Sequence, residues 1–227
     1  LVSLRRFFRM LEKEGLPVQP GVVDKLETMG FRHRRRLPIT LDEEEVRAFL
    51  EVVDNPRDRA ILYVMLFMGL RISEVVALNV DDIREGDEGL VIKGKGDKQR
   101  YVPIHPQVHR AVAAYRRVRP SQVIADRLGV PLFVSRLRRR VDPSTVRRFI
   151  KQYGMKAQKL KAQKARQLSP HKFRHTFATL LLQGQVDIRY IQELLGHEHL
   201  STTQIYTRVA RTDLEAAIAR HRLSDLV

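Results

Sequence analysis

The chain has no cysteine and no long apolar run. Without cysteine there can be neither a disulfide nor a thiolate metal site, and this absence is compatible with a reducing compartment such as the cytoplasm. The longest apolar candidate, residues 60–70, is far shorter than the roughly 18 to 20 residues that span a bilayer, so we expect a buried core helix and no membrane partner. No secretory pattern opens the chain, and because it starts at Leu1 we expect it to be cut from something longer.

Acidic residues are few compared with basic ones. The 227 residues include 42 Lys and Arg but only 26 Asp and Glu, which gives a formal net charge of +16. Such a positive field favours a polyanion, and nucleic acid is the first partner to consider. A ribosome-like protein or one that binds a membrane surface would carry a similar charge, so charge alone leaves these alternatives open. Hydrophobic residues make up 43%, enough for one globular domain, or for one domain and a fragment.

Composition divides the chain into three parts. Residues 1–15 carry apolar side chains at helical spacing and end at Gly15, which predicts one helix. Residues 16–37 are rich in Pro, Gly and Arg, and we interpret them as a basic linker. A compact domain is expected over 38–227.

Two segments of the expected domain have β-type patterns. Residues 88–104 predict a β-hairpin, with Gly94 to Asp97 at its tip, and residues 131–135 predict a short apolar strand. Helical patterns dominate elsewhere. The sequence therefore predicts a mainly α fold with a small antiparallel β-sheet, of the α+β class.

Helix starts are indicated by residues that cap a first turn. Thr40 with Glu43 and Thr212 with Glu215 have the spacing of capping boxes, and Ser73 can cap a short helix. A duplicated KAQK in 156–166 indicates a basic helix, either solvated or in contact with nucleic acid, and the pattern does not choose between the two. The predicted helices cover 41–53, 56–69, 73–80, 106–117, 143–153, 171–183, 188–196 and 213–223.

Two basic residues stand where the chain turns. Arg71 follows the break of an apolar helix at Gly69, where a guanidinium held between two helices could grip an anion. Lys95 lies between two glycines at the hairpin tip, where it could reach a phosphate or donate a proton. Taken alone, each is better explained as an ordinary solvated side chain.

The segment 171-HKFRH-175 combines histidine with arginine on one helical face. His171 and Arg174 are three residues apart, just after a Pro-started helix N-terminus whose dipole favours anions. The two histidines also have the H-x-x-x-H spacing of a zinc site, which His197 and His199 could complete. Lys and Arg between them oppose a bound dication, so we expect no metal here.

In this order, the motifs resemble those of the tyrosine recombinase family, and most of all its Xer-type members and the phage and transposon integrases. The motifs are GLRISE at Arg71, GKGDKQR at Lys95, LSPHKFRH at His171 and Arg174, LLGHEHLSTT at His197 and QIYT at Tyr206. Each motif is weak alone, whereas their order over residues 38–220 is specific. Residues 1–15 resemble the last helix of the family's N-terminal core-binding domain, most of which this chain would then lack.

The resemblance implies a reaction and a role for each residue. DNA strands would be cut and rejoined through a 3′-phosphotyrosyl bond to Tyr206, without metal, ATP or another cofactor. Arg71 and Arg174 would stabilise the phosphate oxygens, with His197 as a further donor. The implied catalytic set is Arg71, Lys95, His171, Arg174, His197 and Tyr206.

The remaining implied roles concern protons and support. A phenol has an ordinary pKa of about 10, so Tyr206 needs a base, and His171 would accept its proton. Lys95 would protonate the leaving 5′-oxygen. Glu74 would orient its neighbours, and His175 would be structural.

Double-stranded DNA is the implied partner, and the location is cytoplasmic, at the nucleoid. The family implies a homo-oligomer, a tetramer on synapsed DNA with exchange of a C-terminal helix, for which residues 213–223 are the candidate and packing in cis is the alternative. Three other functions stay open: a DNA-binding relative without catalysis, a type IB topoisomerase and a metal-dependent nuclease. DNA contacts are expected from Arg34, Arg35, Arg36, Lys98, Arg100, Arg138, Arg139 and Arg140.

Overall fold

The computed structural model of the chain describes residues 2–16, 40–93, 99–157, 160, 162–196 and 208–223. The chain divides into two compact units, Leu1–Leu37 and Pro38–Val227. In the first unit, helix α1 (Val2–Lys13) confirms the predicted N-terminal helix. Phe7 and Met10 of α1 are each 50% exposed, so nothing in the described part of this unit covers that apolar stripe.

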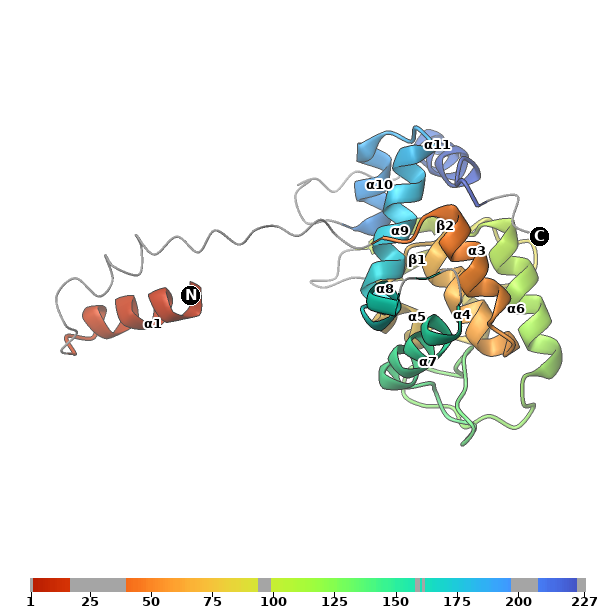
Figure 1. Ribbon diagram of the computed structural model, residues 1–227, viewed down its shortest axis with the longest axis horizontal. Helices are drawn as coiled ribbons and strands as arrows, with labels where there is room; N and C mark the ends of the chain where they lie inside the picture. Colours follow the sequence, from red (N-terminus) through yellow and green to blue (C-terminus); the bar gives the residue numbers. More distant parts are fainter. Residues whose placement is uncertain are drawn as a thin grey trace. The chain divides into compact units, whose positions relative to one another are not determined.

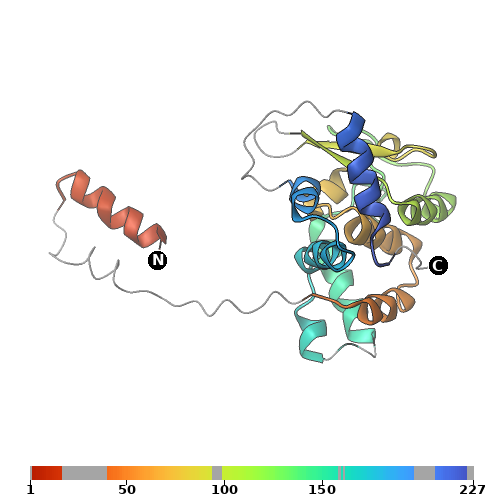
Figure 2. The ribbon, with the colours of Figure 1, turned by 90° about the horizontal axis from the view of Figure 1, so that it is seen from above.

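The second unit is mostly helical and contains a two-stranded antiparallel sheet, which confirms the predicted fold class (Figure 1). Its elements are α3 (Glu43–Glu51), α4 (Pro56–Phe67), α5 (Ile72–Ala77), the 3-10 helix η1 (Val80–Asp82), β1 (Gly89–Lys93), β2 (Gln99–Pro103), α6 (Pro106–Val118), α7 (Pro143–Lys156), α8 (Ala162–Arg166), α9 (Pro170–Gln183), α10 (Ile188–Leu195) and α11 (Arg208–Ala219). The strands form the predicted hairpin, and α11 lies beside it and contacts α10 (Figure 2). Among the helices described, none is long and apolar enough to cross a bilayer.

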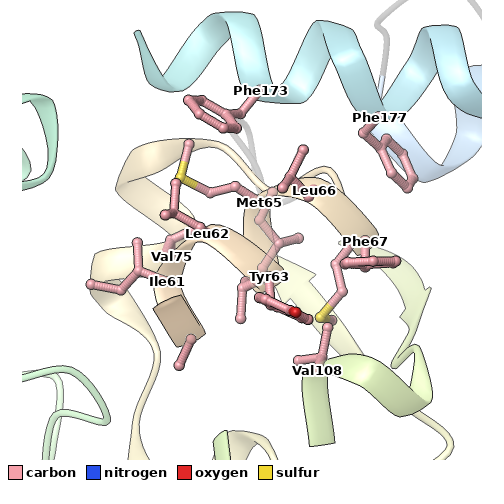
Figure 3. Packing of buried hydrophobic residues seen from close by; sticks show 14 of the residues in the cluster. Ile61, Leu62, Tyr63, Met65, Leu66, Phe67, Val75, Val108, Phe173 and Phe177 are labelled. Carbon is pink, nitrogen blue, oxygen red and sulfur yellow. The ribbon is translucent and has the colours of Figure 1, made fainter. Parts of the chain in front are cut away.

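Helix α4 forms the centre of the core. Every residue from 60 to 70 is buried, as predicted for this apolar segment. A helix that is apolar on all sides needs neighbours on several sides, and α4 packs against both α6 and α9. Figure 3 shows Phe173 and Phe177 extending from α9 towards α4, with Val108 of α6 on another side of α4. This packing fixes the end of α4 relative to the start of α9.

The turn after α4 requires glycine. Gly69 has a φ of 62°, in the left-handed region that favours residues without a Cβ. A Cβ at this position would lie 2.4 Å from Cδ1 of Phe177. The close approach of α9 to the turn therefore sets the direction in which the chain enters α5, which has Arg71 as its N-cap residue.

Two predicted helix caps are wrong by two residues. Helix α3 is capped by Asp42 with Glu45 rather than by Thr40 with Glu43, because the backbone N–H of Leu41 already donates to the Thr176 hydroxyl at 3.0 Å and Leu41 is buried. Helix α5 begins after Arg71 rather than at the predicted Ser73. There the carboxylate of Glu74 accepts the backbone N–H of Arg71 at 2.7 Å.

Two other sequence predictions differ from the structure. Helix α11 begins at Arg208, so Thr212 lies inside it and does not cap it with Glu215. Residues 131–135 make only isolated bridges rather than a strand. Arginine side chains donate to carbonyls that would otherwise bond to a neighbouring strand. Arg119 donates to the carbonyls of Pro131 and Leu132, and Arg57 donates to that of Val134.

The KAQK region is partly packed on the domain. Helix α8 contacts α7, and Ala165 is buried. Lys164 forms an ion pair with Glu45 of α3. This end of the repeat therefore differs from the fully solvated helix that was one of the two alternatives.

Candidate active site

Half of the implied catalytic set lies in the described part of the chain. Arg71, His171 and Arg174 are described, as are the supporting residues Glu74 and His175. The predictions for seven residues, together with the His199 of the zinc alternative, fall outside the described residues: Lys95, His197, Tyr206, Arg34, Arg35, Arg36 and Lys98.

Arg71 has a guanidinium that is held at one side and exposed at the other. Its Nη1 donates to Oε1 of Glu74 at 3.0 Å and its Nη2 donates to the carbonyl of Gly196 at 3.2 Å. The side chain is nevertheless 44% exposed. A guanidinium has five N–H donors, so Arg71 keeps donors for an anion that arrives from solvent.

Arg174 is buried and connects two helix ends. It projects from α9, and its guanidinium donates to the carbonyls of Gly69 and Leu195. Burial, together with the positive charges of Arg71 and Arg100, lowers the pKa of Arg174 to about 9. The group is therefore still cationic at neutral pH, and it keeps that charge in a poorly solvated place where electrostatic interactions are strong.

Arg100 is buried as well, and its partners correct the predicted DNA contact. Its Nη1 and Nη2 donate to the two oxygens of Glu74 at 2.9 and 2.7 Å, and its Nε donates to the carbonyl of Leu194 at 2.8 Å. The guanidinium is buried and already bonds to three acceptors, so it is poorly placed for contact with a DNA backbone. Strand alternation does not give this position, because β2 is buried on both of its faces from Arg100 to Pro103.

The C-terminal carbonyls of α10 bring these arginines together. A helix leaves its last four carbonyls without partners in the helix. The backbone N–H of Gly196, in the left-handed conformation at φ 63°, caps the carbonyls of Gln192 and Glu193. The next three carbonyls accept from three arginines: Leu194 from Arg100, Leu195 from Arg174 and Gly196 from Arg71. The negative end of the helix dipole thus faces three cations.

Glu74 is the carboxylate that Arg71 and Arg100 share. Its side chain is 9% exposed. Burial opposes its ionisation, but hydrogen bonds from Arg100 and Arg71 outweigh this and hold the pKa of Glu74 below its usual range. One carboxylate cannot neutralise three guanidinium groups, so this part of the site carries net positive charge. That charge suits a phosphate.

The two histidines of α9 lie close to each other. The rings of His171 and His175 are 4.3 Å apart between centroids, in an edge-to-face arrangement. His171 is exposed at the start of α9, and His175 is half-buried. Within the described residues no group of three or more His, Asp or Glu could hold a metal ion. His197 and His199, which would complete the four-histidine alternative, lie outside the described residues.

The arginines at 138–140 do not form one surface. Arg138 and Arg139 are exposed. Arg140 instead donates to the carbonyls of Val76, Ala77 and Leu78 at the end of α5 and forms an ion pair with Asp126. It therefore belongs to the support of α5 rather than to the predicted DNA-contacting set.

Comparison with known proteins gives relatives over most of the chain. Residues 40–213 match the phage integrase family. The tyrosine recombinase XerC of Caldanaerobacter subterraneus subsp. tengcongensis is 38% identical over 99% of this chain and 62% of its own length. The crystal structure of XerA recombinase has a TM-score of 0.63 and 35% identity, over 82% of this chain and 66% of that chain.

A structure with DNA is also similar. It is the XerH site-specific recombinase bound to palindromic difH substrate in a post-cleavage complex, with a TM-score of 0.60 and 27% identity over 81% of this chain. These proteins are longer, since this chain spans 62% of the XerC relative and 53% of the XerH chain.

Proposed function

Since the chain belongs to the phage integrase family of tyrosine recombinases, we propose that it is the catalytic part of a site-specific DNA recombinase. One observation carries the proposal. Arg71 and Arg174 come from different helices and donate to adjacent carbonyls at the end of α10, so that two guanidinium groups converge at one place. Two cations held in this way match the two non-bridging oxygens of a phosphodiester.

In the proposed reaction the phenol oxygen of Tyr206 attacks the phosphorus. The bond from phosphorus to the 5′-oxygen breaks as the 3′-phosphotyrosyl bond forms, so one ester replaces another and no ATP is needed. His171 takes the phenol proton, and Lys95 gives a proton to the leaving oxygen. A 5′-hydroxyl from a partner strand then attacks the phosphotyrosine, and both proton transfers run in reverse.

Electrostatic stabilisation is the main task of the arginines. The transition state places more charge on the non-bridging oxygens, and a preorganised donor aimed at that charge is worth about 3 to 4 kcal/mol. Arg71 and Arg174 supply it, with His197 as a third donor, and Glu74 orients Arg71. In many nucleases a dication has this function, whereas here guanidinium groups meet the same demand.

We propose double-stranded DNA at the nucleoid as the substrate, with a homo-tetramer assembled on two synapsed sites. The sequence segments Arg34 to Arg36 and Lys98, with the exposed Arg138 and Arg139, are the candidate backbone contacts. α1 would be the last helix of a core-binding domain, which fits its half-exposed apolar stripe. Leu214, Ala217 and Ile218 of α11 are buried within the chain, which favours packing in cis for this part of the C-terminal segment.

Covalent trapping tests the function. Fragments of the DNA that flanks the gene are incubated with the protein in EDTA, and the cleaved site is then rebuilt as a nicked suicide duplex. We expect an SDS-resistant adduct with the wild type and none with Tyr206→Phe, which should bind the same DNA. An adduct that persists in Tyr206→Phe would exclude Tyr206 as the nucleophile. Loss of cleavage in EDTA would instead indicate a metal-dependent nuclease, and relaxation of any plasmid would indicate a topoisomerase.

A further inference from the structure

Arg100 is the arginine of the site that the proposed reaction does not use. It is 5% exposed, and its guanidinium donates to both oxygens of Glu74 and to the carbonyl of Leu194. A side chain that is buried and bonded in this way is poorly placed to reach a phosphate. Its position nevertheless connects three elements: β2, which carries it, α5, which carries Glu74, and the end of α10.

Each oxygen of the Glu74 carboxylate accepts one hydrogen bond from Arg100 and one from Arg71. Oε1 of Glu74 accepts from Arg100 at 2.9 Å and from Arg71 at 3.0 Å. Oε2 accepts from Arg100 at 2.7 Å and from the backbone N–H of Arg71 at 2.7 Å. Arg100 therefore makes a two-pronged pair with the carboxylate, the geometry in which guanidinium binds carboxylate best, while the Arg71 side chain takes a single bond. Without Arg100, the Arg71 guanidinium would be the one cationic group among the described residues that still donates to the buried carboxylate of Glu74.

The contact with α10 places a second constraint on the site. Nε of Arg100 bonds to Leu194, and a Cβ at Gly196 would lie 3.0 Å from Cδ of Arg100. The aliphatic part of Arg100 thus packs directly under Gly196, whose carbonyl holds Arg71. Both ends of the Arg71 guanidinium are therefore bonded to groups that Arg100 itself contacts.

We propose that Arg100 is a positioning residue for strand cleavage. It takes up the charge of Glu74, so that the Arg71 guanidinium stays available to the scissile phosphate, and it fixes the end of α10 against which Arg71 is aligned. This inference rests on the proposed function, because it assigns Arg100 a part in that reaction through Arg71 and Glu74.

Arg100→Lys is the first variant to test, because lysine keeps the charge but cannot bond to both oxygens of Glu74 and to Leu194 together. Cleavage is followed in single turnovers on the suicide duplex at saturating DNA. We expect the rate constant to fall about 10- to 100-fold, the usual cost of a misplaced catalytic group. The Kd for the duplex should change by less than about threefold, since no phosphate contact is removed. Arg84→Lys, an exposed arginine of an (i, i+3) ion pair, is the matched control and should cleave at the wild-type rate.

Two further measurements separate positioning from a general loss of structure. In a Glu74→Gln background there is no carboxylate for Arg100 to hold with two hydrogen bonds, so Arg100→Lys should cost clearly less than it does in the wild-type background. A duplex with a methylphosphonate at the cleaved position has lost one charged oxygen, so its cleavage depends less on the charge of Arg71. On this duplex the difference in cleavage rate between wild type and Arg100→Lys should be smaller. A variant that is merely unstable would be slow on both substrates and in both backgrounds.

The outcomes are distinct. If wild type forms no adduct, the proposed function fails. If wild type cleaves and Arg100→Lys cleaves equally fast, the function stands and the role of Arg100 is overturned. Equal losses with and without Glu74, or on charged and neutral linkages, would also overturn it. Thermal unfolding of Arg100→Lys and Arg100→Gln shows which variant is folded at the assay temperature. The cleavage rates of that variant are then compared with those of wild type.

Discussion

Arg174 donates a hydrogen bond to the carbonyl of Gly69, which joins the helix that carries one arginine of the site to the turn that leads to the other, Arg71. The same turn packs against Phe177, one helical turn further along α9. The relative placement of the two arginines thus depends on the close contact between Gly69, which has no side chain, and Phe177 of α9. The packing of the core at Gly69 therefore also determines the geometry of the site.

We expect Gly69→Ala to be strongly destabilising. A Cβ at Gly69 would meet Phe177 at 2.4 Å and would be attached to a backbone at φ 62°. Strain and overlap together should lower the free energy of unfolding by about 3 kcal/mol, measured by urea denaturation. Gly86→Ala is the control, since Gly86 also has a positive φ but a Cβ there has no atom within 4 Å, and strain alone should cost about 1 kcal/mol. Equal losses in the two variants would show that the Phe177 contact does not matter.

Arg174→Lys should reduce strand cleavage far more than DNA binding. The guanidinium spans the carbonyls of Gly69 and Leu195, whereas a single ammonium cannot bond to both and still face a phosphate. Removing one such transition-state donor typically lowers the rate about 10²- to 10³-fold, to be measured as adduct formation at saturating DNA. Arg166→Lys, at an exposed position of α8, is the matched control. A rate for Arg174→Lys within about threefold of wild type would argue against the proposed donor role.

Local signals were enough to predict most of the helices. Asn55, Asp142 and Asp187 cap α4, α7 and α10, three helices that the sequence predicts at 56–69, 143–153 and 188–196. Each signal works through hydrogen bonds within one turn, so no information about the rest of the chain is needed. Thr40 and Asp42 show the limit, because each has an acid three residues later, and a contact with distant Thr176 decides between them.

Long-range polar contacts account for what the sequence did not predict. Residues 131–135 have the composition of a strand, yet arginines from other elements take their carbonyls. Arg100 and Arg140 look like surface cations in the sequence, yet Glu74 and the end of α5 hold them inside. Whether a basic side chain is solvated or bonds to a carbonyl depends on tertiary structure. The order of the motifs could therefore predict Arg71 and Arg174, but not the groups that align them.

Stability should fall on mild acidification because two buried histidines are neutral in the folded protein. Burial, with the charge of Arg110, lowers the pKa of His105 to about 4, and burial with His105 lowers that of His221 to about 3. An unfolded histidine has a pKa near 6.5, so between that value and the folded ones the unfolded chain binds more protons. This stability is complete above about pH 6.5 and decreases by up to about 1.4 kcal/mol per pH unit for each group as the pH falls.

His105→Asn isolates one of these two groups. Asparagine does not titrate but can still accept the backbone N–H of Gln107, as His105 does at 3.1 Å to cap α6. Urea denaturation between about pH 7.5 and pH 5 should show a shallower pH dependence than in wild type, by up to about 1.4 kcal/mol per unit. An unchanged dependence would mean that His105 does not remain neutral when folded.

Salt dependence should separate the exposed arginines from Arg140. If Arg138 and Arg139 contact the DNA backbone, each change to glutamine should reduce the slope of log Kd against log salt by about 0.9. Arg140→Gln should leave that slope unchanged and lower the melting temperature, because the carbonyls at the end of α5 and the carboxylate of Asp126 lose their donor. The hydrogen bonds from Arg140 hold the pKa of Asp126 at about 2. A reduced slope for Arg140→Gln with an unchanged melting temperature would return Arg140 to the DNA-contacting set.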